Sequence, residues 1–428
     1  GIKAHKEIAY AKQLGIDFIV CDHHMPDDTL PDAVAILNPK REDDTYPFKH
    51  LCGCGVGFKF MQAFAKNNGI PFSKLMPLLD LCAISIAADL VEVTDENRIL
   101  AYHGLKLINN QPSVGIKAII DICGLSGREI SMGDIVFKIG PRINASGRME
   151  NGKLSVQLLV ENNPDTAITT AKEIDEYNDL RRDIDKQMTE EANVIVERLN
   201  KQENRQCIVV YDENWKKGVV GIVAARLTDM YFRPTVVLTR DGDYAVGSAR
   251  SVAGFDIYSA IKSCRDLLVN FGGHTFACGL TIRWNDVELF KQRIEEYVSR
   301  HIQPTQTVPT LNADATINFS DINRRMLHDL KRFAPFGPGN TKPVFITNEV
   351  YDFGTSKVVG RQQEHLKLEL VDSNSPTVMN GIAFGLSSVA RYIKSRRSFN
   401  VLYTIEENVY RRGNVQLQID DIHIGTKS

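Results

Sequence analysis

The sequence predicts an α/β protein in which two α/β units are joined by one long helix and followed by a small β-barrel. Residues 1–150 alternate helix-like and strand-like stretches, an order typical of an α/β domain with a parallel sheet. Residues 164–200 keep a helical pattern with no Gly or internal Pro, and a second α/β unit opens with the strand-like 207–212. After a linker rich in Thr, Pro and Gln (301–310), short alternating strands separated by turns indicate a barrel or sandwich.

The segments predicted from these patterns have the following bounds: 1–155, 156–203, 204–303 and 310–428. Within the first, helical periodicity covers 2–14, 55–67 and the mostly apolar 75–88, while 16–20 (Ile-Asp-Phe-Ile-Val) has the pattern of a short buried strand. The charged helix at 164–200 either bridges the two α/β units or packs on one of them as a solvated helix.

Composition and charge exclude several classes of protein. The chain has 428 residues, of which 43% are hydrophobic and 24% charged, as in ordinary globular proteins. No apolar run approaches the roughly 18 to 20 residues of a membrane span. Eight scattered cysteines favour reduced thiols in the cytoplasm, and the single residue between Cys52 and Cys54 is a poor spacing for zinc. With a net charge of −2, nucleic-acid binding would have to depend on local patches.

The triplet Asp22-His23-His24 follows the predicted strand at 16–20 directly, and Pro26 ends that strand. Polar catalytic groups in α/β proteins belong at the carboxyl ends of parallel strands, where the sheet opens into a crevice. Imidazole is a good ligand for Mn or Zn, and its second nitrogen needs an orienting partner such as a carboxylate. The triplet therefore predicts a divalent-metal site, with a chance surface motif as the alternative.

Asp89 offers a second carboxylate, inside the nearly all-apolar stretch 82–93. Because unpaired carboxylates are rarely buried, we expect Asp89 either to pair with a cation or to bind a metal. A helix cap or an isolated ion pair is the structural alternative, and the Asp-His-His triplet upstream favours the metal.

A predicted loop at 140–149 carries two arginines, Arg142 and Arg148, around Asn144 and a glycine. Planar guanidinium donors and a closely approaching backbone suit phosphate oxygens. Arginine-rich turns are common, so this segment alone is moderate evidence for an anion site.

Two glycine-containing segments, 247–251 and 272–279, add further donors. Tandem glycines permit a backbone nest for an anion, although each pattern could also be a tight turn. The candidate residues are Ser248, Arg250, Gly272, Gly273 and His274.

Taken in order, these motifs resemble those of the RecJ-type exonucleases of the DHH phosphoesterase superfamily. The matching residues are Asp22-His23-His24, Asp89 followed by Glu96-Asn97-Arg98, and the segments 142–149, 247–251 and 272–279. The family's oligonucleotide-binding (OB) domain is matched by 335–340 (Pro-Phe-Gly-Pro-Gly-Asn), Pro343 and 365–368. The resemblance covers essentially the whole chain and implies a DHH parallel-sheet domain, a DHHA1-like substrate-binding domain and a C-terminal OB fold.

The resemblance also implies an activity. Family members are two-metal phosphodiesterases that use Mn²⁺ or Mg²⁺ to hydrolyse single-stranded DNA, in the 5′ to 3′ direction, in DNA repair and recombination. By this resemblance His23 and Asp89 are metal ligands, His24 faces the scissile phosphate, and Asp22 orients the histidines.

The phosphate-binding roles are implied in the same way. Arg148 would stabilise the charged phosphate in the transition state, with Asn144 nearby. Ser248, Arg250 and His274 would grip the nucleotide, beside the glycines at 272 and 273.

The sequence departs from the family at its beginning. Superfamily members carry an Asp-x-Asp motif near the N-terminus and another aspartate before a Gly-Ile pair like Gly1-Ile2, and none of these acids is present. The first residues also read as the inside of an amphipathic helix, so we expect the front of the catalytic domain to be missing. Asp17 precedes the strand and Asp22 already has a role, so neither replaces the absent acids. We therefore expect an incomplete metal site that binds metal weakly and cuts DNA poorly.

Basic residues gather towards the C-terminus. They are Arg391, Lys394, Arg396, Arg397, Arg411 and Arg412. The aromatic residues between them are Tyr392, Phe399, Tyr403 and Tyr410. This combination predicts backbone tracking and base stacking along a single strand, with Arg396 and Arg397 as substrate-binding residues. The alternative is that the aromatics form the barrel core and the arginines a solvated rim.

Two other functions stay open. A DHH phosphoesterase acting on short oligonucleotides, cyclic dinucleotides or polyphosphate would end soon after Gly279. A nucleic-acid-binding scaffold descended from such a nuclease would have lost the metal residues, whereas His23, His24 and Asp89 are present. Single-stranded DNA is the expected partner and a membrane is not. Repair or replication proteins, such as a single-strand-binding protein or a helicase, are expected as further partners of unknown identity.

Overall fold

The computed structural model describes residues 1–149, 152–202, 205–408 and 414–424. The chain divides into two compact units. Unit 1 comprises Gly1–Gln111, Glu129–Val136 and Leu311–Ser428, and unit 2 comprises Pro112–Arg128 and Phe137–Thr310. The four segment bounds predicted from the sequence follow a different division and stay a prediction.

Unit 1 begins with α1 (His5–Gln13), β1 (Ile19–Cys21) and β2 (Ala35–Leu37). β1 and β2 pair in parallel, as predicted, and Val20 packs with Ile2 and Ile8 in a small core. The expectation of a buried strand is wrong, because Ile19 is 49% exposed. Among the described residues β1 pairs with β2 alone. Only the middle residue of β1, Val20, is buried, so one face of the strand stays exposed.

The helices that follow in unit 1 are α2 (Gly53–Asn67), α3 (Leu79–Ala88), α4 (Asp95–Asn110) and α6 (Met132–Asp134). α3 is mostly apolar, with Asp80 buried near its start, and it packs against both α2 and α4. Its burial is as the sequence predicts. Asp89 is the C-cap residue of α3, so the helix end positions this carboxylate.

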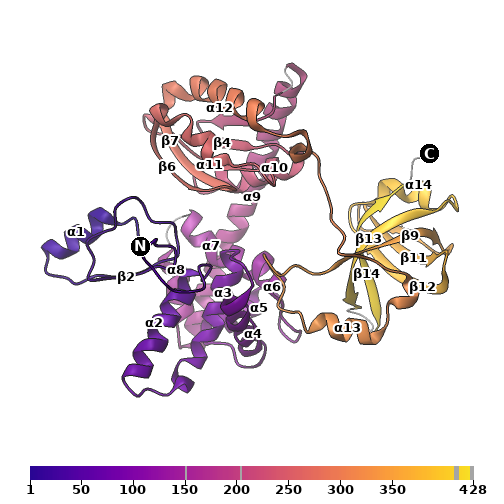
Figure 1. The fold of residues 1–428 in the computed structure, drawn as a ribbon, viewed down its shortest axis with the longest axis horizontal. Coiled ribbons are helices and arrows are strands. Elements are labelled where there is room, and N and C mark those ends of the chain that lie inside the picture. Colours follow the sequence, from indigo (N-terminus) through magenta and orange to yellow (C-terminus); the bar gives the residue numbers. More distant parts are fainter. Residues whose placement is uncertain (150–151, 203–204, 409–413, 425–428) are drawn as a thin grey trace. The chain divides into compact units, whose positions relative to one another are not determined.

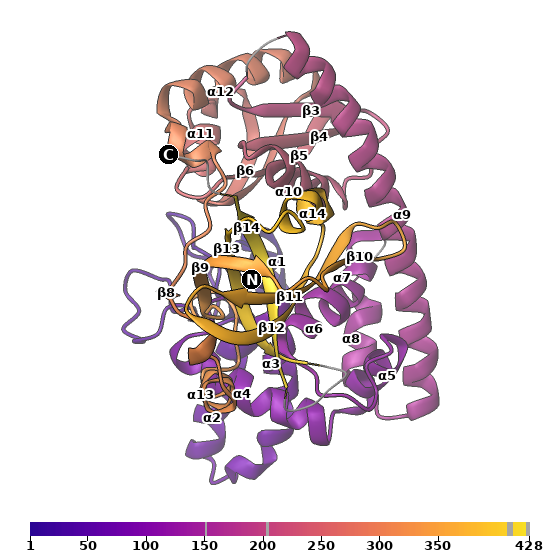
Figure 2. The same ribbon diagram turned by 90° about the vertical axis from the view of Figure 1, so that its right-hand side faces the viewer.

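The C-terminal part of unit 1 is β-rich. Its elements are β8 (Ala315–Thr316), α13 (Arg324–Lys331), β9 (Val344–Asp352), β10 (Lys357–Val359), β11 (His365–Asp372), β12 (Ser375–Ala383), α14 (Ala390–Ile393), β13 (Phe399–Glu407) and β14 (Val415–His423). The strands pair in the order β9, β13, β14, β12, β11, and β11 pairs again with β9. These pairings form a closed circuit of five strands, gathered into one curled sheet (Figure 2). The predicted small barrel with an OB fold therefore has the connectivity to enclose a core.

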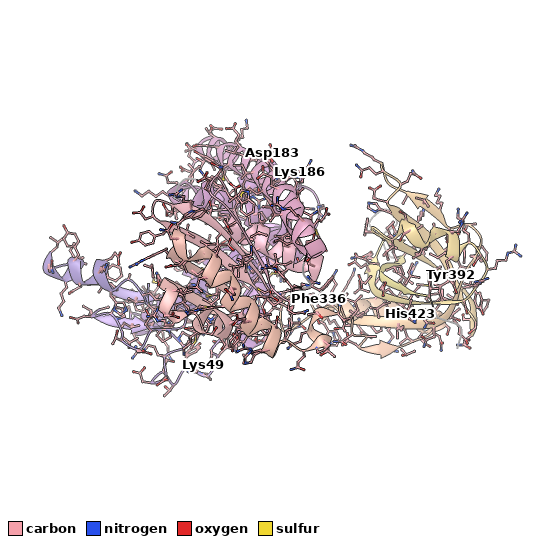
Figure 3. All side chains as sticks on the ribbon, turned by 90° about the horizontal axis from the view of Figure 1, so that it is seen from above. Lys49, Asp183, Lys186, Phe336, Tyr392 and His423 are labelled. Atoms are coloured by element: carbon pink, nitrogen blue, oxygen red, sulfur yellow. The ribbon has the colours of Figure 1, made fainter. Side chains whose placement is uncertain are left out.

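The aromatic residues of this barrel belong to its core. Phe399 and Tyr403 are buried, and the Tyr403 hydroxyl lies 2.7 Å from that of Thr347. Tyr392, on α14, packs against the same core (Figure 3). The prediction of base stacking is therefore wrong for these aromatics, because the pleat of β13 turns Phe399 and Tyr403 inward and α14 packs Tyr392 against them. The core alternative is confirmed.

Unit 2 contains helices and one sheet. The helices are α5 (Val114–Ile122), α7 (Gly140–Met149), α8 (Lys153–Val160), α9 (Pro164–Gln202), α10 (Val220–Tyr231), α11 (Ile257–Lys262) and α12 (Val287–His301). The strands are β3 (Ile208–Asp212), β4 (Thr235–Asp241), β5 (Tyr244–Arg250), β6 (Leu268–His274) and β7 (Ala277–Arg283). The single helix α9 confirms the helical pattern predicted for 164–200.

The sheet of unit 2 has the order β3-β4-β5-β7-β6, in which β3 and β4 are parallel and the remaining pairs antiparallel. One face packs on α11 and α12, and the other on α9 and α10 (Figure 1). Since residues alternate between the faces of a strand, Ser248 and Arg250 lie on the same face as Val237, whose partners come from α9 and α10.

None of the helices in the described ranges combines the length and the apolar character needed to cross a bilayer.

Candidate functional site

Asp22 organises the residues that follow β1. Its buried carboxylate accepts hydrogen bonds from the backbone N–H groups of Ile2 (2.6 Å), His23 (2.7 Å) and His24 (3.1 Å). Its Oδ1 also lies 2.7 Å from Nδ1 of His24. Burial opposes ionisation, but these hydrogen bonds outweigh it and hold the pKa of Asp22 well below its usual range. An ionised Asp22 requires the proton of His24 to sit on Nδ1, which leaves Nε2 free for a ligand.

His23 and Asp89 form the second pair of this site. Nε2 of His23 lies 2.9 Å from Oδ2 of Asp89. The hydrogen bond from His23 lowers the pKa of Asp89 against partial burial, with nearby positive charge on Lys40 adding to the effect. The carboxylate of Asp89 is 45% exposed, so the sequence argument from burial is wrong. The end of α3 lifts this residue out of the apolar stretch that contains it.

These residues fit a divalent cation. Asp22, His23 and His24 each offer a ligand atom, and these atoms lie within 4.8 Å of one another. The 2.9 Å between His23 and Asp89 is close to the roughly 3 Å that separates neighbouring ligands of an octahedral ion at about 2.1 Å. Among the described residues, the buried Nδ1 of His23 has no hydrogen-bond partner. Carboxylate oxygens suit Mn²⁺ or Mg²⁺, and the imidazole nitrogens favour Mn²⁺ over Mg²⁺.

Asn38 and Lys40 belong to the same site and were missed by the sequence reasoning. The amide of the buried Asn38 donates to the carbonyl oxygen of His24 (2.8 Å) and accepts from the N–H of Lys40 (3.0 Å). Both residues follow β2, which runs parallel to β1. The signal that identified Asp22, polar groups directly after a strand, would have identified Asn38 as well.

The predicted loop at 140–149 is wrong: these residues form the helix α7, directly after a π-helical turn at Ile135–Ile139. Pro141, which has no N–H to donate, lies two residues after that turn, where the hydrogen-bond register of the helix changes. Ser146 is buried and its hydroxyl lies 2.7 Å from that of Ser155. Burial of the helix face with Ala145 and Ser146 stabilises α7 despite Gly140 and Gly147. Asn144 is exposed.

Arg148 lies near the end of α7 and is solvent-exposed. Its Nη1 donates to the carbonyl oxygen of Gly218 at 3.3 Å. A Cβ at position 218 would lie 2.0 Å from the carbonyl oxygen of Arg148, so only glycine allows the turn before α10 to approach α7 this closely. Partial desolvation lowers the pKa of Arg148, with Asp185 opposing the effect.

The glycine-containing segments are strands and not the predicted nest or turn. Ser248 on β5 and Gly272 on β6 both pair with Gly279 on β7, and Arg250 and His274 both pair with Ala277. These pairings form two adjacent rows across the sheet. β7 contributes only small residues, Ala277 and Gly279, between the donors of β5 and β6 on this face.

Arg250 is held within this face. Its Nη1 donates to the hydroxyl oxygen of Ser248 (2.6 Å) and to the carbonyl oxygen of Ala249 (2.8 Å). Gly273 lies between the two rows, and His274 is exposed. The structure thus places Ser248, Arg250, Gly272 and His274 in two neighbouring rows of one sheet, and their role in substrate binding stays a prediction.

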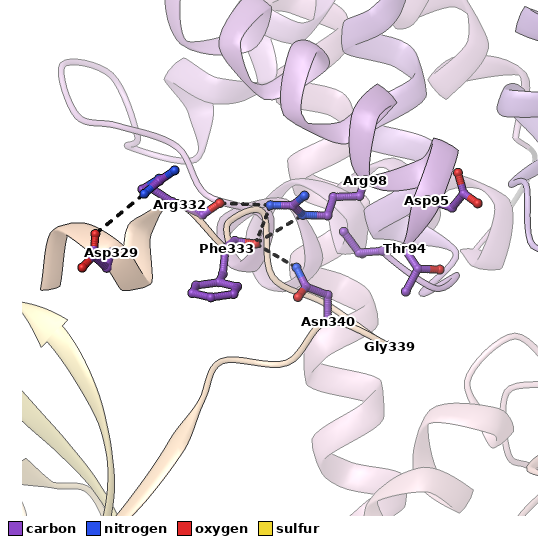
Figure 4. Close-up of a pocket in the computed structure, with 9 residues that line it drawn as sticks. Thr94, Asp95, Arg98, Asp329, Arg332, Phe333, Gly339 and Asn340 are labelled. Carbon is purple, nitrogen blue, oxygen red and sulfur yellow. Dashed lines mark hydrogen bonds and ion pairs between the residues drawn. The ribbon is translucent and has the colours of Figure 1, made fainter. Parts of the chain in front are cut away.

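Two further features lie in the C-terminal part. Arg396 and Arg397 are exposed after α14, whereas Tyr410, Arg411 and Arg412 fall outside the described residues. A cavity of about 650 Å³ lies where the segment after α13 meets the start of α4 (Figure 4). There Arg98 donates to the carbonyl oxygens of residues 332, 333 and 334 at 3.0–3.4 Å, which satisfies carbonyls at a helix end.

Three family models match the chain. They are the DHH family N-terminal domain over residues 1–86, the DHHA1 domain over 192–300 and the RecJ OB domain over 313–421.

Curated relatives cover nearly the whole chain. The single-stranded-DNA-specific exonuclease RecJ of Salmonella typhimurium is 33% identical over 99% of this chain and 76% of that protein. RecJ of Escherichia coli is 31% identical over 98% of this chain and 75% of that protein. RecJ of Bacillus subtilis is 36% identical over 88% of this chain. The match covers about half of that relative's length, 47%.

The fold is similar to that of solved structures. The crystal structure of RecJ in complex with Mn²⁺ from Thermus thermophilus has a TM-score of 0.83 and 24% identity, and it covers all of this chain, which spans 61% of that one. A manganese-bound exonuclease RecJ has a TM-score of 0.57 and 29% identity over 72% of this chain and 76% of its own. With three family models and relatives above 30% identity along most of its length, the chain belongs to the RecJ family of DHH single-stranded-DNA-specific exonucleases.

Proposed function

We propose that this chain acts in a divalent-metal-dependent exonuclease that hydrolyses phosphodiester bonds of single-stranded DNA. The observation that carries the proposal is the pairing of His23 with Asp89 beside a His24 whose tautomer is held by Asp22. Relatives named as single-stranded-DNA-specific exonucleases, and a related structure with bound Mn²⁺, support the reaction and the metal.

In this proposal His23 and Asp89 hold the metal, which when bound supplies an activated water and offsets the charge on the phosphate. Ionised Asp22 keeps the Nδ1 proton of His24 in place, so that Nε2 can meet a phosphate oxygen. Asn38 fixes the main chain of His24 through its carbonyl oxygen, which limits how far the imidazole can move.

The donors of unit 2 bind the substrate in this proposal. Arg148 supplies a charged donor for the negative charge that develops on the phosphate, with Asn144 on the same helix. Ser248, Arg250 and His274 grip the nucleotide from one face of the sheet, beside Gly272 and Gly273.

The proposal also covers the direction of digestion, the cellular compartment and the protein partners. We infer digestion from the 5′ end by resemblance to the family, in DNA repair and recombination. A cytoplasmic location is supported by the eight cysteines, all within the described residues and all free thiols. A single-strand-binding protein or a helicase is proposed as a protein partner.

The test uses the protein with any residues that its gene places before Gly1. Single strands labelled at the 5′ or the 3′ end, and the matching duplex, are incubated with Mn²⁺ or with EDTA. We expect metal-dependent loss of single strands, with the 5′ label released first and the duplex spared. His24→Ala should slow the reaction about 10²-fold or more. His328→Ala, at an exposed histidine of α13, is the matched control and should leave the rate unchanged.

The alternatives give different results in the same assay. Equal degradation of duplex and single strands would reject the proposed function. Hydrolysis of cyclic dinucleotides without digestion of long strands would favour the DHH phosphoesterase. Tight binding of single strands that no divalent metal converts to cleavage would favour the scaffold.

A further inference from the structure

Helix α9 carries a buried polar cluster that none of the roles above uses. Asp185 is 1% exposed and Asn178 is buried as well, whereas Asp183 and Lys186, on the same helix (Figure 3), face solvent. A buried carboxylate in a charged helix is rare unless it is paired. The burial of Asp185 therefore indicates a specific partner.

That partner is arginine. Nη2 of Arg226, on α10, donates to Oδ2 of Asp185 at 2.7 Å, and Asp185 also lies 3.4 Å from the hydroxyl of Thr189. On α9 itself, Nη2 of Arg181 donates to Oδ1 of Asn178 at 3.1 Å. Asp185 and Asn178 thus hold two guanidinium groups in place on neighbouring helices.

Arg181 keeps unused hydrogen-bonding capacity. In the described part of the chain its Nε is buried without an acceptor, and its Nη1 has no protein partner. A buried donor without an acceptor costs free energy, and native structures keep few of them. A ligand that offers oxygen atoms would relieve this.

The surroundings of Arg181 are strongly positive. Arg148 on α7, Arg226 on α10 and Arg250 on β5 come from three elements that pack together with α9 or with one another. Gly221 brings the start of α10 against the guanidinium of Arg250, since a Cβ there would lie 3.2 Å from its Nη2. Asp185 pairs with Arg226, and its charge also acts on Arg148 and Arg181, so one carboxylate stands against three arginines.

The positive charges of these arginines repel one another. Desolvation lowers the pKa of Arg181, Asp185 opposes this, and the charges of Arg148, Arg182 and Arg226 lower the pKa further. Desolvation and the charge of Arg148 lower the pKa of Arg250 in the same way. Like charges in a partly dry site are stabilised by an anion, and the anion on a nucleic acid is its backbone phosphate.

We propose that Arg181 binds a backbone phosphate of the single strand, next to the phosphate contacts of Arg148 and Arg250, and that Asp185 and Asn178 position this cluster. The inference rests on the proposed function, because it takes single-stranded nucleic acid as the ligand. It adds helix α9 to the substrate-binding surface. Asp185 acts through the arginines and does not touch the substrate.

The first experiment measures binding without cleavage. The anisotropy of a fluorescein-labelled oligothymidylate is followed in EDTA over a range of salt concentrations, with the unmodified chain and with Arg181→Ala. We expect about tenfold weaker binding, and a slope of log K against log salt that is smaller by about 0.7, as for one lost phosphate contact. Arg181→Lys should restore the slope but not the full affinity, because lysine lacks the planar fork that Asn178 holds.

Arg182→Ala is the matched control. This neighbouring side chain is 65% exposed and lies 3.6 Å from Asp179, so its loss removes the same charge one residue away. It should leave affinity and slope close to those of the unmodified chain. Circular dichroism melting curves of every variant show whether it is folded at the temperature of the assay.

The variant Asp185→Asn tests whether Asp185 positions the arginines or acts only through its charge. If Asp185 acted only through its negative charge, its removal would leave the neighbouring arginines more attractive to DNA, and binding would become stronger. The proposal expects the opposite, about threefold to tenfold weaker binding by a folded variant, because Arg226 and its neighbours lose their anchor.

The outcomes can be told apart. If Arg181→Ala binds like the unmodified chain with the same slope, while Arg148→Ala binds weakly, the inference is wrong and the proposed function stands. Tighter binding by Asp185→Asn would likewise reject the positioning role. If the unmodified chain itself shows no affinity for single strands, the proposed function fails first.

Discussion

His23 and Asp89 lie at the two ends of one hydrogen bond, 2.9 Å long, that joins the loop after β1 to the end of α3. Neither residue reaches its position through local sequence alone. The parallel pairing of β1 with β2 directs His23 to the edge of the sheet, and the buried α3 ends where Asp89 can meet it. This contact brings together the two residues that we propose as metal ligands.

Replacement of His23 by alanine should therefore weaken metal binding. We expect the affinity for Mn²⁺ to fall by about tenfold or more, because an imidazole ligand is lost and Asp89 loses its partner. Isothermal titration with Mn²⁺ measures the change, and His328→Ala serves as the control. Equal affinities of the parent chain and His23→Ala would show that the ion binds elsewhere.

The exposed arginines after α14 should contribute charge to DNA binding. Replacement of Arg396 and Arg397 together by alanine should reduce the slope of log K against log salt for a single strand by about 0.7 for each phosphate contact that is lost. Arg300→Ala, at an exposed arginine of α12, is the control. An unchanged slope would assign these arginines to a solvated rim.

The start of α4 and the segment after α13 pack without space for a side chain at Gly337. A Cβ there would lie 2.4 Å from Cγ2 of Val93, so Gly337→Ala should lower the free energy of unfolding by about 1–3 kcal/mol. Adding Val93→Ala should recover part of that loss, and urea unfolding measures both. Gly57→Ala, where a Cβ would meet nothing within 4 Å, should not destabilise the chain.

Tyr403 should make the barrel sensitive to alkali. Burial, with nearby carboxylates, raises the pKa of Tyr403 to about 12 from its usual 10.0, although the hydrogen bond with Thr347 opposes the shift. The unfolded chain ionises first, so this contribution to stability is complete below pH 10 and is lost as the pH rises towards 12, by about 2–3 kcal/mol.

The variant Tyr403→Phe tests this pH dependence. It should lose about 1 kcal/mol at neutral pH with the hydrogen bond to Thr347, yet its stability should fall less between pH 10 and 12. Tyr244→Phe, at an exposed tyrosine, is the control. Parallel pH profiles for Tyr403→Phe and the parent would contradict the assignment.

Arg98 should stabilise the contact between α4 and the segment after α13. Arg98→Ala removes its hydrogen bonds to three carbonyl oxygens and should lower the free energy of unfolding by about 1–2 kcal/mol. Arg332→Ala leaves the carbonyl oxygen in place and should have a smaller effect. Thermal unfolding of the two variants distinguishes them.

The sequence predicted best where one local pattern decides the structure. The unbroken helical pattern of 164–200 needs no tertiary information, and α9 has nearly those bounds. The position of Asp22-His23-His24 after a strand followed from the general rule for parallel sheets. In each case the signal lies within a few neighbouring residues.

It predicted less well where packing competes with local preference. Two glycines and a proline indicated a loop at 140–149, but burial of Ala145 and Ser146 stabilises a helix there. Tyr403 can be a stacking surface or a core residue, and only the strand register decides which. The partners of Asp185 come from other elements, so no spacing in the sequence reveals them.

Arg98 recognises its neighbours through main-chain atoms alone, the carbonyl oxygens of three consecutive residues. Every amino acid carries the same carbonyl group. Substitutions at 332, 333 and 334 can therefore accumulate over evolution without loss of this contact, as long as the backbone keeps its path. These three positions are free to vary in sequence while the attachment of the segment to α4 stays the same.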